Sequence, residues 1–177
     1  MNKTFDVAVV GATGAVGETI ISILEERKFP VGTLYPLASA RSAGNRVEFR
    51  GSHVKVQDLA QFDFSKAQIG LFSAGGEVSA IYAPKAAAAG CVVIDNTAHF
   101  RYEPDIPLVV PEVNPHAIAG YTARNIIANP NCSTIQMVLV LAPLHVKYRL
   151  KRIVVSTYQS VTGTGKDAVQ QMMDERQ

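Results

Sequence analysis

A cysteine at the start of an expected helix is the first candidate for chemistry. Cys132 follows the turn residues Asn-Pro-Asn and precedes the apolar run "TIQMVLVLAPL", so we expect it at a helix N-terminus. Unpaired N–H groups and the helix dipole favour a thiolate there. An inert core thiol is the alternative, because free cysteine is among the most buried residue types. Other parts of the sequence have to decide between the two.

Three glycines in "GATGAVG" predict a nucleotide-binding turn. Gly11, Gly14 and Gly17 follow a β-branched strand pattern and open a helical pattern. Such a turn lets backbone N–H groups approach a pyrophosphate at the helix N-terminus. The spacing differs from the commoner G-x-G-x-x-G, and a glycine-rich turn alone is a weak signal. The prediction therefore depends on the strand–turn–helix context.

The residues after the second expected strand indicate which dinucleotide binds. An NAD site usually has Asp or Glu at this point to hold the ribose 2′-hydroxyl. Here the sequence is "LASARSAGN", which offers Ser39, Arg41 and Ser42 and no carboxylate. A guanidinium and hydroxyls suit a 2′-phosphate, so NADP is favoured over NAD. A solvated loop arginine is the alternative.

Two further strand ends have polar residues. "FSAGGEVS" supplies Ser73 and Gly75, with room for backbone near a dinucleotide, and "DNTAHFRY" supplies Asn96 and Arg101. Arg101 could hold an anionic substrate bidentately, or it could form a surface ion pair. The four histidines lack metal-ligand spacing to one another, so no metal site is expected.

The pattern of elements predicts an α/β fold with a doubly wound parallel sheet. The expected strands lie within residues 5–10, 31–39, 68–72, 91–97, 107–114, 124–131 and 152–160, with a hairpin in 45–59. The expected helices lie within residues 15–28, 77–91, 132–144 and 166–177, the last without a stop signal. The chain is therefore expected to end inside an element, as a fragment would.

Composition narrows the class of protein. The chain has 177 residues, 47% hydrophobic and 18% charged, with a formal net charge of +2, which fits a globular domain. Without a Lys/Arg block, nucleic acid is not an expected partner. The apolar stretches are too short for a membrane span, and the N-terminus leaves no room for a signal peptide. Two cysteines give no disulfide framework, so we expect a cytoplasmic protein.

Seven motifs occur together and in order, and they carry a specific resemblance. They are "GATGAVGE", "LASARSAG", "FSAGG", "DNTAHFR", "VPEVN", "NPNCST" and "YQSVTGTG". The chain resembles the aspartate-β-semialdehyde dehydrogenase family along essentially its whole length. The resemblance implies an NADP-binding Rossmann-like domain over residues 1–129 and the beginning of an α+β catalytic and dimerisation domain over 130–177.

The resemblance also implies a reaction. Members of this family reduce L-aspartyl-4-phosphate to L-aspartate-4-semialdehyde with NADPH, through a cysteine thioacyl intermediate, toward lysine, methionine and threonine. They form homodimers or homotetramers when full length. The substrate is a small molecule, and the reverse reaction requires phosphate.

Residue roles follow from matching positions. Cys132 matches the family's nucleophile. Asn131 matches the neighbouring asparagine, which helps to hold the phosphate and to orient the acyl group. Gln159 matches the glutamine that orients the substrate. Arg101, with Asn96, matches the substrate-phosphate site. The matching cofactor positions are Gly11, Thr13, Gly14, Ala15 and Val16 at the pyrophosphate, Ser39, Arg41 and Ser42 at the 2′-phosphate, Ser73 and Gly75 beside them, and Thr162 and Gly163 at the nicotinamide.

The sequence departs from the family pattern at a few points. Thr97 and Ala98 stand where the family more often has two serines, and Thr162 stands for a serine. The family's catalytic histidine, second substrate arginine and phosphate-binding lysine come from later segments, and we find no general acid or base in these residues. The chain alone is therefore expected to be inactive.

Two alternatives stay open. N-acetyl-γ-glutamyl-phosphate reductase uses the same logic in a related layout. A non-catalytic NADP-binding paralogue would keep the fold and lose the chemistry, although the Asn131–Cys132 pair and Gln159 argue against it.

Overall fold

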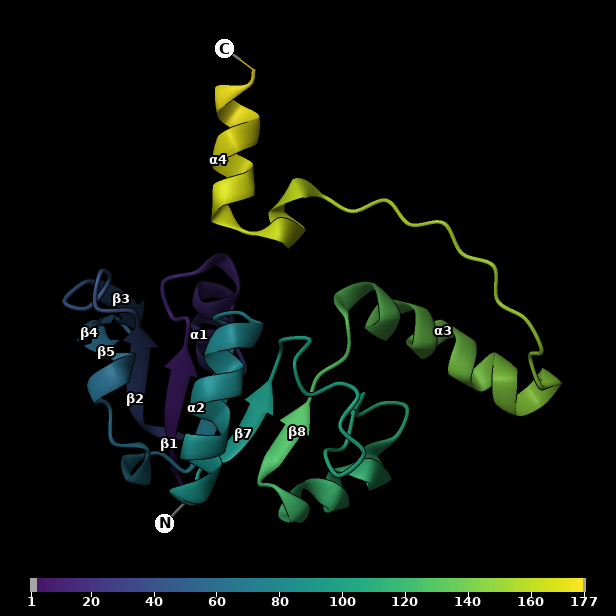
Figure 1. The fold of residues 1–177 in the computed structure, drawn as a ribbon, viewed down its shortest axis with the longest axis horizontal. Coiled ribbons are helices and arrows are strands. Elements are labelled where there is room, and N and C mark those ends of the chain that lie inside the picture. The colour runs from purple at the N-terminus through teal and green to yellow at the C-terminus, as the bar shows by residue number, and fades with distance from the viewer. Residues whose placement is uncertain (1–2, 177) are drawn as a thin grey trace.

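A six-stranded sheet forms the centre of the computed structural model, which describes residues 3–176 (Figure 1). Every neighbouring pair of its strands is parallel. In spatial order the strands are β5 (Gln57–Asp58), β2 (Val31–Ala38), β1 (Phe5–Val10), β6 (Ile69–Phe72), β7 (Val92–Asp95) and β8 (Ile126–Ala128). The predicted Rossmann-like, doubly wound α/β class is confirmed.

Helices cover both faces of this sheet. They are α1 (Ala15–Glu26) and α2 (Gly76–Ala88). Side chains of β1 alternate between the two faces: Val9 belongs to the cluster of Ile21 from α1, and Val10 to the cluster of Ala83 from α2. Burial on both faces explains why β1 is apolar throughout instead of alternating polar and apolar residues.

The strand order reverses next to β1. The chain passes from β1 to β2 on one side and later returns to β6 on the other. At the carboxyl ends of these strands, Gly11 N donates to Leu37 O (2.9 Å) and Ser73 N donates to Val10 O (2.9 Å). The glycine turn after β1 and the turn after β6 therefore lie side by side, at the crevice where doubly wound folds bind ligands.

Smaller elements complete the N-terminal part. The predicted hairpin is confirmed as β3 (Arg46–Phe49) and β4 (Ser52–Lys55), paired antiparallel. The 3-10 helices are η1 (Leu59–Gln61), η2 (Phe64–Lys66), η3 (Pro115–Ala123) and η4 (Val161–Thr164).

The strand predicted over residues 107–114 is wrong. Only Leu108 bridges to the sheet, at Ala128 of β8. Pro107 and Pro111 have no N–H to donate to a ladder, and the Asn114 side chain folds back to bond Val110 N and Leu108 O. The segment consequently turns away after a single bridge.

The strand predicted over residues 152–160 is also wrong. This segment leaves the far end of α3 (Cys132–Tyr148) and runs, extended, back toward η4 and α4 (Lys166–Asp174) (Figure 1). Ile153, Val154 and Val155 are all exposed, and no strand among the described residues lies beside them. β-branched residues favour extended backbone, but a strand needs a partner.

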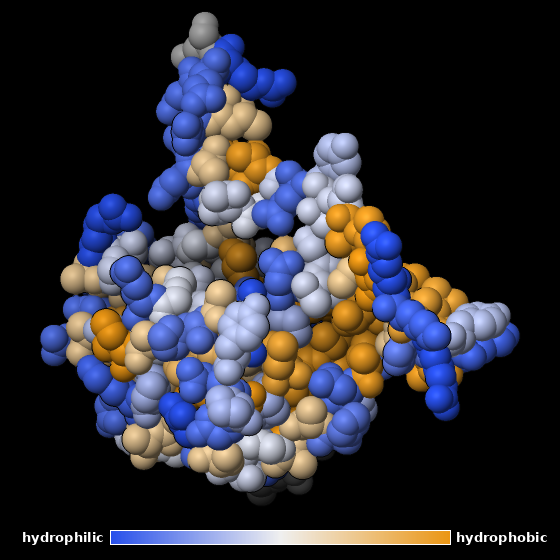
Figure 2. All heavy atoms as spheres, turned by 45° about the vertical axis from the view of Figure 1, so that its right-hand side comes forward, coloured by the Kyte–Doolittle hydropathy of each residue, from blue (hydrophilic) through white to orange (hydrophobic). Residues whose placement is uncertain are grey.

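α3 differs from its prediction in length and in exposure. It continues four residues beyond Leu144 and ends where Arg149 adopts a left-handed conformation (φ +55°). Apolar side chains lie exposed along it, and Figure 2 shows a hydrophobic area on this side of the molecule. They are Leu139, Val140, Leu144 and Val146. α3 begins the segment assigned to a second domain, and the boundary at residue 129 stays a prediction.

Within residues 3–176, none of the helices is long and apolar enough to cross a membrane. α4 ends at Asp174, and residue 177 lies outside the described residues.

Candidate active site

Cys132 is the first residue of α3, as predicted from the turn before it. Asn131 caps the helix, and its Oδ1 accepts hydrogen bonds from Ser133 N (3.0 Å) and Thr134 N (3.3 Å). This cap occupies two of the first-turn N–H groups that the sequence analysis expected to be unpaired and to favour a thiolate. The Asn131 Nδ2 amide is left as the side-chain donor beside Cys132.

The two cysteines lie in opposite environments. Cys132 is exposed, so a substrate carbonyl can reach its Sγ. Cys91 is fully buried, and burial raises the pKa of its thiol to about 12. Cys91 is therefore the inert core thiol, and the nucleophile interpretation belongs to Cys132.

Gln159 lies against Cys132, although 27 residues separate them. Cys132 Sγ is 4.0 Å from Gln159 Oε1. The extended segment brings Gln159 to this position, and Gly163 packs against its side chain: a Cβ on Gly163 would lie 2.3 Å from Gln159 Nε2. The small residue of η4 is therefore what leaves room for the glutamine.

Arg101 is anchored to backbone carbonyls. Its Nε donates to Asn129 O (2.9 Å) and its Nη2 to Asn96 O (3.3 Å). Asn129 Nδ2 also donates to Asn96 Oδ1, which ties the two loops together. These bonds fix the guanidinium and leave Nη1 available to an anion. Sequence reasoning missed Asn129, although it lies in the Asn-Pro-Asn turn.

A buried carboxylate supports this loop from behind. Asp95, at the end of β7, is fully buried and accepts hydrogen bonds from Ser79 Oγ (2.7 Å) and Thr97 Oγ1 (2.7 Å). Ser79 belongs to α2, so the network joins a helix, a strand and the loop of Asn96. Thr97 keeps the hydroxyl of the serine that is more common in the family, and this hydroxyl makes the bond to Asp95.

A cleft of about 850 Å³ brings most of the predicted residues together. It contains every predicted site residue except Gly11, Ser39 and Gln159. Its lining residues are Thr13, Gly14, Ala15, Val16, Arg41, Ser42, Asn45, Ser73, Gly75, Asn96, Arg101, Asn131, Cys132, Thr162, Gly163, Thr164, Gly165, Lys166 and Asp167. Lys166 and Asp167 were missed by sequence reasoning, which read their segment only as a helix.

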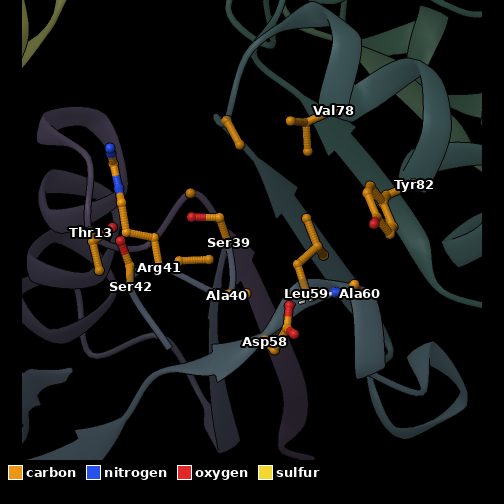
Figure 3. Close-up of a pocket in the computed structure, with 13 residues that line it drawn as sticks. Thr13, Ser39, Ala40, Arg41, Ser42, Asp58, Leu59, Ala60, Val78 and Tyr82 are labelled. Carbon is orange, nitrogen blue, oxygen red and sulfur yellow. Dashed lines mark hydrogen bonds between the residues drawn. The ribbon is translucent and has the colours of Figure 1, made fainter. Parts of the chain in front are cut away.

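A second pocket of about 430 Å³ adjoins the cleft and holds Gly11 and Ser39 (Figure 3). The two cavities share Thr13, Arg41 and Ser42. In Figure 3 these three lie on one side, with Ser39 toward the middle, and Val78 and Tyr82 lie on the opposite side. Asp58, Leu59 and Ala60 line the remaining wall.

Apolar walls with polar groups at one edge suit a flat heterocycle attached to a phosphorylated sugar. Asp58 was not predicted here: β5 places it level with Ala38 of β2, and its Oδ1 accepts a hydrogen bond from Ala60 N (3.0 Å). This carboxylate caps η1 within the same pocket as Arg41.

The glycine turn fits a dinucleotide pyrophosphate. Gly11 has φ +87°, and a Cβ on Gly17 would lie 2.1 Å from Gly11 O, so α1 approaches β1 closely only with glycine there. No side chain caps the N-terminus of α1, so its first N–H groups are free to bind an anion.

None of the four histidines lines the described cleft. Residues 3–176 also contain no group of three or more His, Cys, Asp or Glu side chains that could hold a metal.

Comparison with known proteins places this architecture in a family. The profile described as "Semialdehyde dehydrogenase, NAD binding domain" matches residues 6–121. The aspartate-semialdehyde dehydrogenase of Shewanella sp. (strain DB6705) is 60% identical over 172 residues, which are 97% of this chain and 51% of that protein. That of Legionella pneumophila is 60% identical over 173 residues, 98% of this chain and 50% of that protein.

Solved structures of aspartate semialdehyde dehydrogenases are also similar to this chain. Aspartate semialdehyde dehydrogenase II of Vibrio cholerae, complexed with ASA, is 57% identical with a TM-score of 0.96, over 98% of this chain and 52% of that one. The Candida albicans enzyme with NADP is 28% identical with a TM-score of 0.68, over 82% of this chain and 48% of that one. The chain spans about half the length of the curated relatives it matches. It belongs to the semialdehyde dehydrogenase family, and it corresponds to the N-terminal half of aspartate-semialdehyde dehydrogenases.

Proposed function

We propose that this chain is the cofactor-binding and nucleophile-bearing part of an NADP-dependent aspartate-semialdehyde dehydrogenase. The reaction is the reversible, phosphate-dependent conversion of L-aspartyl-4-phosphate to L-aspartate-4-semialdehyde, a step toward lysine, methionine and threonine. One observation carries the proposal. Cys132, Arg101 and the glycine turn line a single cleft, so an acyl phosphate at the cysteine would lie beside a dinucleotide.

The cofactor would occupy both cavities. The uncapped N-terminus of α1 would hold the pyrophosphate, and the pocket of Leu59, Val78 and Tyr82 would hold the adenine. Arg41 and Ser42 line both cavities, where a 2′-phosphate would lie, and this supports NADP over NAD. When bound, NADPH supplies the hydride that reduces the acyl group.

Cys132 would act as the nucleophile. Its Sγ forms a bond to the acyl carbon of aspartyl phosphate, and the carbon–oxygen bond to phosphate breaks as phosphate leaves with the electron pair. The product of this step is a thioester on Cys132. Asn131 Nδ2 is placed to donate to the acyl oxygen as negative charge develops on it.

Arg101 and Gln159 would orient the substrate. The free Nη1 of Arg101 would bind the phosphate of the substrate, held rigidly because the other guanidinium bonds are made to Asn129 O and Asn96 O. Gln159 would orient the aspartyl group near the thioester, from its position beside Sγ.

Turnover also needs a general acid or base, and no histidine lines the described cleft to supply one. We therefore propose that this chain binds the cofactor but does not turn over substrate alone. The exposed apolar face of α3 and the extended segment after it support burial against further protein. A homodimer or homotetramer of the full-length protein, located in the cytoplasm, is part of the proposal.

The test is an assay of the full-length gene product with L-aspartate-4-semialdehyde, inorganic phosphate and NADP, following NADPH absorbance. We expect phosphate-dependent NADPH formation that Cys132→Ser abolishes while NADP binding persists. Rates at the wild-type level in Cys132→Ser would remove the nucleophile from the proposal.

The same assay separates the alternatives. Turnover of N-acetylglutamate semialdehyde in place of aspartate semialdehyde would indicate the reductase. NADP binding with no turnover of either aldehyde would indicate a non-catalytic paralogue. The relatives named above are aspartate-semialdehyde dehydrogenases, which favours the first outcome.

A further inference from the structure

Lys166 brings a positive charge to the glycine turn from the other end of the chain. It is the first residue of α4, and its Nζ donates to Thr13 O at 2.9 Å. The same nitrogen pairs with Glu18 Oε1 of α1 at 2.6 Å. These two contacts are separated by 153 and 148 residues in sequence. The proposed mechanism gives this ammonium no role.

The ammonium has a donor to spare. A lysine side chain carries three N–H donors, and Thr13 O and Glu18 take two of them. Lys166 lines the same cleft as Ala15 and Val16, whose N–H groups belong to the uncapped N-terminus of α1. Backbone amides and an ammonium that converge in this way form a site for a phosphate group.

The charge balance of the cleft favours an anionic ligand. The charged residues lining it are Arg41, Arg101, Lys166 and Asp167, so cations outnumber carboxylates. Arg41 lies toward the second pocket, which it also lines, and Arg101 lies at the loop of Asn96. Lys166 is the cation in contact with the glycine turn itself.

We propose that Lys166 is a further cofactor-binding residue, which donates to the nicotinamide-side phosphate of the NADP pyrophosphate. This inference rests on the proposed NADP binding. The assignment to that phosphate follows from position, because Lys166 comes directly after Thr162–Gly165, which line the cleft and would flank the nicotinamide. Gly165 turns the backbone just before it (φ +113°).

Glu18 is a weak partner of the ammonium and does not determine its position. Both side chains of the pair are about half exposed, at 52% and 53%, so the pair contributes little to stability, and the bond to Thr13 O holds Lys166 at the turn without it.

Direct binding measurements test the role. Kd values for NADP and for adenosine 2′,5′-bisphosphate are measured by calorimetry on the wild-type chain, Lys166→Met, Lys166→Arg and Glu18→Gln. The bisphosphate keeps the 2′-phosphate and the adenosine-side phosphate but lacks the nicotinamide-side phosphate. Lys151→Met, which changes an exposed lysine outside the cleft, is the matched control. The thermal midpoint of each variant without ligand checks that it folds.

We expect Lys166→Met to weaken NADP about tenfold, as loss of a charge-assisted hydrogen bond would. Its Kd for the bisphosphate, and both Kd values of Glu18→Gln and Lys151→Met, should stay within about twofold of wild type. Lys166→Arg should recover most of the NADP affinity.

Three outcomes would overturn the inference. NADP affinity in Lys166→Met could equal that of wild type, or both ligands could weaken equally, which would mean only a diffuse charge effect. Glu18→Gln could lose as much NADP affinity as Lys166→Met, which would make the ion pair a structural strap. A wild-type chain that does not bind NADP would instead overturn the proposed function, and this inference with it.

Discussion

Cys132 Sγ lies 4.0 Å from Gln159 Oε1, although the two residues belong to different segments and are 27 positions apart in sequence. Cys132 is the first residue of α3, whereas Gln159 lies at the end of an exposed extended segment, just before η4. The contact depends on what flanks Gln159 on its other side. That neighbour is Gly163, whose missing side chain leaves the space that the amide fills.

Gly163→Ala should therefore uncouple Gln159 from Cys132 while the fold persists. The added Cβ would lie 2.3 Å from Gln159 Nε2, and a flexible side chain moves aside at little cost. We expect the phosphate-dependent rate of the full-length gene product to fall about 10²-fold, since a misplacement near 1 Å has that effect. The measurement is kcat together with the thermal midpoint.

Gly120→Ala is the matched control, because its Cβ would meet only ordinary contacts, 3.7 Å from Pro107 at the nearest. Equal rates in the Gly163→Ala and Gly120→Ala variants would show that Gln159 does not need its place beside Cys132.

Arg41→Ala should weaken NADP binding and leave NAD binding almost unchanged. Arg41 lines both cavities at the expected position of the 2′-phosphate, and charge-assisted bonds of about 1.5–3 kcal/mol correspond to a loss of roughly 10- to 100-fold. Kd values for both dinucleotides measure the effect. Arg46→Ala, an exposed arginine outside these cavities, is the control. Equal losses for NADP and NAD would take Arg41 out of the 2′-phosphate site.

Most of the sheet could be predicted from the sequence because its signals are local. β1, α1, α2 and β6 have apolar patterns bounded by glycines, and the cofactor loops lie at their junctions. The prediction over residues 152–160 failed for the opposite reason. Ile153, Val154 and Val155 favour extended backbone, but pairing is a property of neighbours that the local pattern does not contain.

The parts of the site that were missed are long-range. Lys166 meets Thr13 across 153 residues, and Tyr82 and Asp58 reach the second pocket from elements with no motif of their own. Asn129 had a signal in its Asn-Pro turn, but only the fold shows that its carbonyl holds Arg101. Sequence motifs identify residues that are expected to contact a ligand. The residues that hold those ligand-contacting side chains in position are found only in the tertiary structure.

Gly17→Ala should destabilise the N-terminal domain. Its Cβ would lie 2.1 Å from Gly11 O and 2.8 Å from Ala12 Cα, which are backbone atoms of the buried turn. Overpacking of this kind costs about 1–3 kcal/mol. Urea unfolding followed by circular dichroism measures the loss, with Gly120→Ala as the reference. A free energy of unfolding equal to that of the reference would mean that α1 can move away from β1 freely.

A thiol reagent should distinguish the two cysteines of the folded chain. Burial raises the pKa of Cys91 to about 12, so its thiol stays protonated and shielded at about pH 8, whereas Cys132 is exposed. We expect iodoacetamide to add one carboxamidomethyl group, on Cys132, by peptide mass spectrometry, and Cys132→Ser to prevent the addition. Labelling of Cys91 at a comparable rate would mean that the core opens readily.

The raised pKa of Cys91 also sets a pH dependence of stability. Because the folded chain holds this proton more tightly than the unfolded chain, whose thiol titrates near 9.0, stability is unaffected below that pH and falls as pH rises toward 12. Urea midpoints measured upward from neutral pH should therefore decline only in the alkaline range, and a decline absent there would contradict the burial of Cys91.

Thr97→Val should disturb the substrate side of the cleft and spare the cofactor side. The hydroxyl donates to Asp95 Oδ2 at 2.7 Å, and its removal leaves a fully buried carboxylate one donor short, which costs about 1.5–3 kcal/mol of stability. Asn96 lies between these residues in sequence, and its carbonyl accepts the Arg101 bond. Movement of the loop should therefore raise the KM for phosphate in the full-length gene product more than it lowers kcat.

Thr97→Ser separates the hydroxyl from the methyl group. Serine can make the same bond to Asp95, so this variant should recover both the KM for phosphate and most of the stability. Ser79→Ala removes the other hydroxyl donor to Asp95 from α2, away from the loop, and should lower stability with a smaller change in KM. If Thr97→Val and Ser79→Ala raised the KM equally, the network would act on the whole domain instead of positioning the Arg101 loop.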